Sequence, residues 1–347
     1  MTRRQDEVGL VADPRRARLR FVTDDARGYR RVRRGKGFRY VDPSGRPAPE
    51  AVRRRARALA VPPAWTDVWI SASPNGHLQA TGRDARGRKQ YRYHPAWRAA
   101  RDGEKYAKLA HLGKGLPRLR RRVRADLRKR DVPREKVLAT VVRLIEETAS
   151  RVGNDEYARA NRSYGLTTLR DRHARISRGK VRLRYRGKSG TWREASVEDP
   201  TLAGIVRRCQ ALPGQRLFQY RDGDGRVREV TSQDVNAYLR ETVGDGVTAK
   251  DLRTWTGTVL VARELGRRGP PRSERHAKRG ETEAIDRVAR ELGNTRAVCR
   301  ASYVHPLVFE AYRDGRLRRA FAAARNGRAH EERALLRLLK GERRRPA

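Results

Sequence analysis

Hydrophobic and polar residues alternate in several short segments of the first hundred residues, which predicts a small β-rich unit. Turn sequences such as PSGRP and PNG separate the expected strands. These strands are FRYVD (38–42), DVWISAS (67–73), HLQATGRD (77–84) and KQYRY (89–93). One helix is expected between the first two, from Ala48 to Leu59, before the pair Pro62 and Pro63. Residues 1–30 are charged and lack periodicity, so a loosely ordered basic arm is expected there.

The pattern becomes helical in the rest of the chain. After Pro133, apolar residues recur at a spacing of three to four over 137–148, which predicts an amphipathic helix. Further helices are expected near 200–211, 232–242, 249–265, 281–292 and 305–325. A short β excursion interrupts them at 166–170, 181–187 and 191–197. The basic segment 98–118, which follows Pro95, is interpreted as a linker.

These patterns predict an α+β protein with a basic arm (1–30), a small β-rich N-terminal domain (31–98) and a larger, mainly α-helical domain (99–347). The larger domain would contain a short sheet with a β-hairpin. A chain of 347 residues is long enough for two or three domains with a sizeable core.

The charge of the chain indicates its partner. Lys and Arg total 84 against 40 Asp and Glu, a formal net charge of +44. Such an excess favours a polyanion, since each phosphate that is neutralised releases counterions, and nucleic acid is the obvious candidate. No segment approaches the roughly 18–20 apolar residues of a membrane span, and the N-terminus is polar throughout. We therefore expect a cytoplasmic, nucleoid-associated protein, and the Arg and Ala bias is typical of a high-GC bacterial genome.

Neither a metal nor a nucleotide cofactor is expected. Cys209 and Cys299 are the only cysteines, and no two histidines lie four residues apart. The Gly187–Ser189 triplet ends like a phosphate-binding loop, but Arg182 stands where the first glycine of that loop is required. Nothing in the sequence suggests the use of ATP.

The segment LGNTRAVCRASYVH places Tyr303 nine residues after Asn294, with Arg296 and Arg300 between them. A tyrosine hydroxyl is a poor nucleophile because the free phenol has a pKa of roughly 10. Nearby cations would stabilise both its phenolate and an anionic phosphate that it attacks.

Three other segments complete a chemical set. Arg151 lies where the predicted amphipathic helix gives way to glycine, and Lys188 lies at the tip of a tight hairpin (184–194). Arg253 lies in the first turn of another predicted helix. With Tyr303 and Asn294, they offer two guanidiniums, one ammonium, one amide and one phenol. This set matches the needs of phosphodiester transesterification by tyrosine.

In residues and order, these four segments resemble the motifs of the type IB DNA topoisomerases, in their compact poxvirus-like bacterial form. The resemblance covers roughly residues 31–325. It implies a monomeric enzyme that relaxes positive and negative supercoils without ATP or an obligatory metal, through a 3′-phosphotyrosyl intermediate. It also implies that both domains form a clamp around duplex DNA.

The resemblance also implies roles for single residues. Tyr303 would be the nucleophile, Arg151 and Arg253 would hold the non-bridging oxygens, and Lys188 would be the general acid. Asn294 stands where many relatives have histidine. Since an amide cannot carry a proton, we expect it only to donate a hydrogen bond in the transition state.

In the N-terminal unit, GRKQYRYHP (87–95) resembles the strand by which the family's smaller domain touches the DNA major groove. Gln90, Tyr91 and Tyr93 match that motif. The alternative is that the two tyrosines pack on the face of the strand, since alternate aromatics on a strand pair well across a sheet.

Two other functions are considered. A tyrosine recombinase uses the same chemistry, but recombinases usually have histidine three residues before the second arginine, where this chain has Lys250. A non-catalytic architectural DNA-binding protein would explain the charge without the chemistry.

Overall fold

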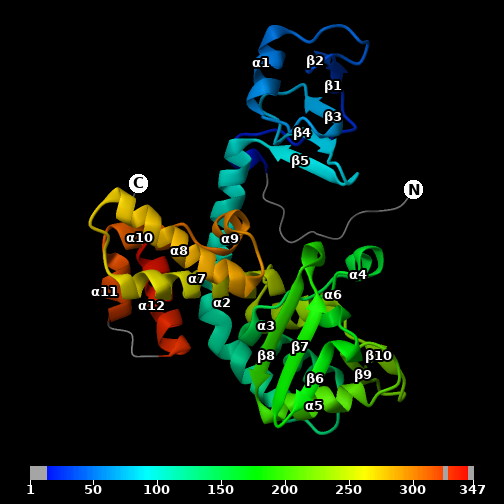
Figure 1. Cartoon of the computed structure of the whole chain (residues 1–347), viewed down its shortest axis with the longest axis vertical. Helices are drawn as coiled ribbons and strands as arrows, with labels where there is room; N and C mark the ends of the chain where they lie inside the picture. The colour runs from blue at the N-terminus through cyan, green and yellow to red at the C-terminus, as the bar shows by residue number, and fades with distance from the viewer. Residues whose placement is uncertain (1–13, 323–326, 343–347) are drawn as a thin grey trace. The chain divides into compact units, whose positions relative to one another are not determined.

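The computed structural model describes residues 14–322 and 327–342. The chain divides into two compact units, residues 1–106 and 107–347, called here the sheet unit and the helical unit. An antiparallel sheet dominates the first, whereas helices and two small sheets build the second (Figure 1). The protein is therefore of the α+β class. In the described part of the chain, no helix combines the length and apolar character needed to cross a bilayer.

The sheet unit contains five antiparallel strands in the order β2-β1-β3-β4-β5. They are β1 (Gly28–Arg34), β2 (Gly37–Val41), β3 (Thr66–Ser71), β4 (Leu78–Arg83) and β5 (Lys89–Tyr93). Helix α1 (Glu50–Ala58) contributes Ala56 to a small core with Val68, Ile70 and Ala80. The four strands and the helix expected in this region are confirmed.

The expectation of a loosely ordered arm is wrong for the residues of the arm that the structure describes, and residues 1–13 lie outside them. Leu19 is buried in a cluster with Trp97, and the Val22 N–H donates to His77 Nδ1 at 3.1 Å. Strand β1 begins within the expected arm, at Gly28. Isolated apolar residues such as Leu19 give no periodic signal, yet burying one is enough to fix a segment against a sheet.

The segment 98–118, expected as a linker, contains the boundary between the two units at 106/107, but it is helical and belongs to the 33-residue helix α2 (Pro95–Leu127). Leucines at 109, 112, 116 and 119 are spaced three or four residues apart and are all buried. They form one apolar face, as an amphipathic helix requires. Glycines, Pro117 and a high density of charge obscured this face in the sequence.

The helical unit contains ten further helices among its described residues. They are α3 (Arg134–Thr148), α4 (Asp155–Asn161), α5 (Pro200–Gln210), α6 (Ser232–Val243), α7 (Ala249–Arg268), α8 (Glu274–Leu292), α9 (Arg296–Tyr303), α10 (Leu307–Arg313), α11 (Arg316–Ala322) and α12 (Arg328–Glu342). The helix expected at 305–325 is two helices, since Gly315 between them takes a φ of +76°.

A three-stranded antiparallel sheet, in the order β6-β7-β8, flanks these helices (Figure 1). Its strands are β6 (Ala174–Ser177), β7 (Lys180–Arg186) and β8 (Trp192–Glu198), and β9 (Gln219–Arg221) pairs with β10 (Val227–Glu229). Helices α3 and α5 pack on the three-stranded sheet. Valine, leucine and tyrosine alternate with arginine along β7, so one face of the sheet is buried and its outer face is basic.

The strand expected at 166–170 is wrong. Residues Leu166–Thr168 form a 3-10 turn, in which the Gly165 N–H donates to Thr168 Oγ1 at 2.9 Å and the Thr168 hydroxyl donates to the Gly165 carbonyl at 3.0 Å. Threonine side chains that bond the local backbone compete with strand pairing in this way.

A close contact between α2 and α7 gives a test of this packing. A Cβ on Gly113 would lie 2.3 Å from Cη2 of the buried Trp255, whereas a Cβ on Gly204 in α5 would meet nothing within 4 Å. We predict that Gly113→Ala lowers the free energy of unfolding by about 1–3 kcal/mol because of overpacking. Gly204→Ala should raise it by up to about 1 kcal/mol, because alanine favours helix. Urea denaturation of the two variants measures both, and equal effects would contradict the packing of α2 on Trp255.

Candidate active site around Tyr303

Arg253 lies where the ends of two helices meet. Its side chain, on the first turns of α7, is only 3% exposed. Nη1 donates to the Ala149 carbonyl at the end of α3 at 2.6 Å, and Nη2 donates to the Leu292 carbonyl at the end of α8 at 3.1 Å. The last carbonyls of a helix lack partners within it and form the negative end of its dipole. A guanidinium is therefore well suited to join the two ends.

The chain then places two further candidate residues beside Arg253. Arg151 follows the left-handed turn at Ala149 (φ 48°), and Asn294 follows the left-handed Gly293 (φ 60°). Nη2 of Arg151 donates to Asn294 Oδ1 at 2.5 Å and to the Gly293 carbonyl at 3.2 Å. Two residues 143 positions apart in the sequence thus form one hydrogen-bonded pair.

Tyr303, the last residue of α9, lies against both arginines. Its ring centroid is 5.2 Å from Cζ of Arg253, a cation–π distance. Arg151 is close enough to the phenol for the two groups to interact electrostatically. The backbone of Tyr303 lies against α7, where a Cβ on Gly257 would approach its carbonyl oxygen to 2.7 Å. The phenol is therefore held in place by its backbone as well as by its ring.

The electrostatics of this cluster favour an anion. Burial lowers the pKa of Arg253, while the Tyr303 phenol opposes this shift and Arg151 and Arg193 add to it. Burial likewise lowers the pKa of Arg151, again opposed by Tyr303. Both guanidiniums remain charged at neutral pH. Positive charges that are held together away from solvent are stabilised by a bound anion far more than they would be in water.

Two buried donors of the cluster are without a partner among the described residues: Arg253 Nε and Asn294 Nδ2. A buried donor left unpaired costs roughly 1–3 kcal/mol, so such groups are rare in folded proteins. A phosphate oxygen would be a suitable acceptor for either donor.

Lys188 is placed differently. It lies at the exposed tip of the β7–β8 hairpin, where Ser189 (φ 64°) and Gly190 (φ 76°) form a tight left-handed turn. In the described part of the chain, its ammonium makes no hydrogen bond or ion pair. The structure thus brings together Tyr303, Arg151, Arg253 and Asn294, and leaves Lys188 without a contact to them.

Arg193 is a residue of the site that the sequence did not single out. From strand β8 it donates to the Arg290 carbonyl at 3.3 Å and to the Glu291 carbonyl at 2.8 Å, both in the last turn of α8. A Cβ on Gly293 would lie 2.4 Å from its Nη1, so a side chain there would displace the Arg193 guanidinium. Arg193 joins the hairpin that carries Lys188 to the corner that carries Asn294. In the sequence, the only indication of a role for Arg193 was its place in the same hairpin as Lys188, five residues later.

Arg296 and Arg300, the two cations between Asn294 and Tyr303 in the sequence, are paired with carboxylates. Arg296 forms two hydrogen bonds of 2.6 Å with Asp286, and Arg300 donates to Glu281 at 2.8 Å. Both carboxylates belong to α8. The two arginines therefore fix helix α9, and with it Tyr303, onto α8.

The three residues expected to touch DNA lie on β5 of the sheet unit. Tyr91 is 45% exposed and stacks on Tyr93, with ring centroids 6.0 Å apart. Gln90 donates to Asp84 Oδ2 at 3.0 Å. The tyrosines thus pack against each other, and Tyr91 also offers an exposed ring.

No metal site emerges from residues 14–322 and 327–342, where no three His, Cys, Asp or Glu side chains come together in a way that could hold an ion.

Comparison with protein families gives two matches that together span most of the chain. Residues 94–324 match the catalytic core of eukaryotic DNA topoisomerase I, and residues 37–84 match the N-terminal domain of bacterial DNA topoisomerase IB. DNA topoisomerase 1B of Acanthamoeba polyphaga mimivirus is 33% identical over 267 residues, which cover 75% of this chain and 80% of the viral protein.

Two other similarities are more distant. DNA topoisomerase 1 of Mycosarcoma maydis is 26% identical over 176 residues, which cover 46% of this chain but only 17% of that protein. A solved structure of the XerH site-specific recombinase, bound to its palindromic difH substrate in a post-cleavage complex, has 13% identity and a TM-score of 0.35. The aligned region covers 60% of this chain and 51% of the recombinase chain. A similarity this distant supports no conclusion about the structure of this protein.

The ion pairs between α8 and α9 give a test of how the site is held. Glu281 is 1% exposed and accepts from both Arg300 and Arg313 at 2.8 Å. We predict that Glu281→Gln lowers the free energy of unfolding by about 1–3 kcal/mol, because two arginines lose their charged acceptor.

Glu198→Gln is the matched control, since Glu198 pairs with Lys180 at 2.6 Å but is 77% exposed. Loss of this ion pair should change the free energy of unfolding very little, because exposed ion pairs contribute little to stability. Urea denaturation distinguishes the two, and comparable losses would show that Glu281 does not hold α9.

Proposed function

Because this chain belongs to the type IB DNA topoisomerases, we propose that it relaxes positive and negative supercoils by nicking one strand through a 3′-phosphotyrosyl bond at Tyr303. The free end then swivels about the intact strand, and the nick is resealed. The observation that carries the proposal is the position of the Tyr303 ring beside two guanidiniums, the buried one of Arg253 and the half-buried one of Arg151.

In the cleavage step, Tyr303 Oη loses its proton to solvent and forms a bond to phosphorus while the bond from phosphorus to the 5′-oxygen breaks. Negative charge grows on the non-bridging oxygens of the phosphorane. An arginine has five N–H donors, and the two carbonyls that hold Arg253 occupy only two of them. The donors that remain, with those of Arg151, suit planar contact to these oxygens. Loss of one such donor typically slows an enzyme on the order of 10²–10³-fold.

Asn294 has a narrower role than a histidine would have. Its Oδ1 accepts a hydrogen bond from Arg151, whereas its Nδ2 has no partner among the described residues and is available to donate. It can therefore donate a hydrogen bond to a non-bridging oxygen, but it cannot transfer a proton.

Lys188 is the proposed general acid. The leaving 5′-alkoxide needs a proton, and arginine is a poor source because it stays protonated. A lysine ammonium has a free pKa of about 10.4 and can give up a proton. Its place on an exposed hairpin, which Arg193 joins to the end of α8 beside Asn294, supports this role. In religation the neutral amine takes the proton back as the 5′-hydroxyl attacks.

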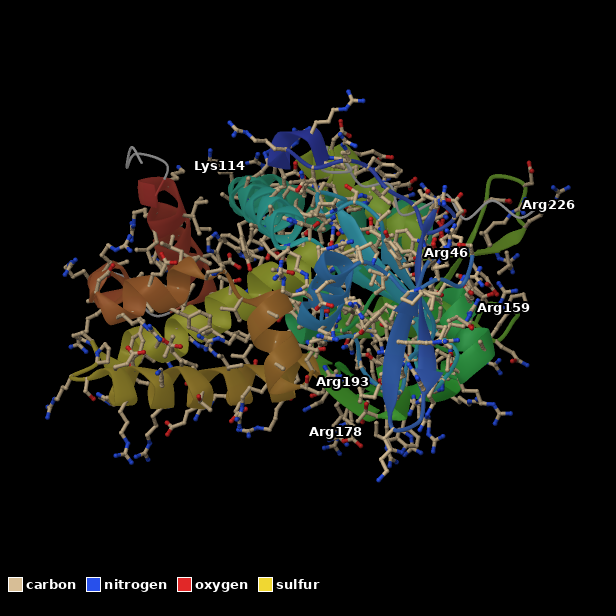
Figure 2. The ribbon with its side chains drawn as sticks, turned by 90° about the horizontal axis from the view of Figure 1, so that it is seen from above. Arg46, Lys114, Arg159, Arg178, Arg193 and Arg226 are labelled. Carbon is tan, nitrogen blue, oxygen red and sulfur yellow. The ribbon has the colours of Figure 1, made fainter. Side chains whose placement is uncertain are left out.

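The energy of the broken phosphodiester is kept in the phosphotyrosine, so the reaction needs no ATP. Basic side chains project outward from the helical unit, among them Arg159, Arg178 and Arg226 (Figure 2). We propose that the N-terminal domain (31–98) and the catalytic domain (99–347) hold the duplex as a clamp in a monomeric, nucleoid-associated enzyme. Gln90, Tyr91 and Tyr93 would contact the major groove. This grip should weaken steeply with salt.

Plasmid relaxation tests the proposed function. We predict that the protein relaxes supercoiled plasmid in EDTA without ATP, and that Tyr303→Phe binds the plasmid but does not relax it. Tyr312→Phe is the matched control, since that buried hydroxyl has no partner among the described residues and should be dispensable. Relaxation by the Tyr303→Phe protein would refute the nucleophile, and binding without relaxation by every protein would favour an architectural role.

The role of Lys188 has its own test. Lys188→Ala should slow single-turnover cleavage on the order of 10²–10⁴-fold, as expected for loss of a general acid. On DNA whose leaving 5′-oxygen is replaced by sulfur, the defect should nearly vanish, because a thiolate leaves without a proton. Arg151→Ala should slow cleavage of both substrates. Equal defects of Lys188→Ala on the two substrates would exclude it as the acid.

A further inference from the structure

The outer face of the three-stranded sheet carries a groove of about 910 Å³. Exposed residues of β7 and β8 form its floor, and the segments around Tyr164 and His173 line it as well. The Tyr164 N–H donates to the Arg186 carbonyl at 2.7 Å, so that segment meets the end of β7, beyond the part of the strand that pairs with β6. The residues that line the groove are thus distinct from those that the proposed reaction uses.

The groove is strongly basic. Six arginines line it together with a single carboxylate, Glu194: Arg162, Arg172, Arg175, Arg182, Arg184 and Arg186. Arg184 pairs with Glu194 at 3.1 Å, and within residues 14–322 and 327–342 the other five form no ion pair. His173 adds no charge at neutral pH, since burial lowers its pKa to about 4. A ligand that fits this groove must be polyanionic.

An aromatic platform lies among these charges. Trp192 is 57% exposed, and the guanidiniums of Arg184 and Arg186 lie 5.0 Å and 5.6 Å from its ring. Aromatic rings interleaved with basic side chains are the pattern by which proteins bind single-stranded nucleic acid, with bases on the rings and phosphates on the cations. A duplex keeps its base faces stacked inside the helix, so only an unpaired base can lie flat on this indole.

The groove is separate from the Tyr303 cluster. Trp192 and Arg193 are neighbours in β8, so their side chains leave the strand on opposite sides. Arg193 reaches the end of α8 beside Asn294, whereas Trp192 lines the groove. The groove therefore lies on the side of the hairpin away from the phenol.

We propose that this groove binds single-stranded nucleic acid, with phosphates on its arginines and a base stacked on Trp192. This activity goes beyond supercoil relaxation and does not depend on Tyr303.

Fluorescence anisotropy of a short labelled oligothymidylate tests the proposal. The full chain with Tyr303→Phe is first saturated with unlabelled duplex DNA, which occupies the proposed catalytic site. The oligothymidylate should still bind. Trp192→Ala and Arg182→Gln should each weaken it on the order of tenfold, while Trp192→Phe, which keeps a stacking ring, should bind nearly as wild type.

Arg207→Gln is the matched control, because Arg207 is an exposed arginine of α5 outside the groove. This control variant should bind the oligothymidylate as the wild type does. In the chain with Tyr303 intact, the Trp192→Ala and Arg182→Gln variants should each relax plasmid at the wild-type rate. Loss of oligothymidylate binding on saturation with duplex, or equal effects of Arg182→Gln and Arg207→Gln, would overturn the proposal. Parallel loss of relaxation in the groove variants would also overturn it, since the groove would then belong to the duplex site. Failure of the wild-type chain to relax plasmid would refute the proposed function alone.

Discussion

The buried guanidinium of Arg253 is the constraint on which the rest of the site depends. A charge that is removed from water is costly unless hydrogen bonds compensate it, and here the carbonyls of Ala149 and Leu292 do so from the negative ends of two helices. Arg151 lies two residues beyond the first carbonyl, and Asn294 two residues beyond the second. Fixing Arg253 therefore fixes both of them, and its own planar group then lies over the ring of Tyr303. One side chain of α7 thus organises residues from α3, α8 and α9.

Arginine has three different physical roles in this strongly basic chain. Arg151 and Arg253 are partly or fully buried and bind backbone carbonyls, so their charge is held at one place. Arg296 and Arg300 are bound to carboxylates and serve as attachments between helices. Along the outer face of β7, Arg182 and Arg186 form no ion pair with any described residue, Arg184 pairs with Glu194, and Arg184 and Arg186 lie beside an exposed tryptophan. Only the first and the third kinds remain available to an anion, so the net charge alone overstates how many arginines can bind phosphate.

The local parts of the fold could be predicted from the sequence, because alternation, spacing and turn residues act over a few positions. The strands ending at Val41 and Tyr93 and the helix after Pro133 are examples. The family was also predictable, since the segments around Arg151, Lys188, Arg253 and Tyr303 resemble its motifs, and the comparisons confirm it. The partners of Arg300 and Arg193 could not be predicted. Their contacts lie 19 and 98 residues away and depend on how helices pack, which spacing along one helix does not reveal.

The most direct measurement is the chemical identity of the bond between protein and DNA. A suicide substrate that traps the cleaved state, followed by proteolysis and mass spectrometry, should give one modified peptide, with the nucleotide joined to Tyr303 through its 3′-phosphate. A nucleotide on another side chain, a 5′-phosphate linkage, or the absence of any adduct from a protein that relaxes DNA would contradict the central role of this phenol.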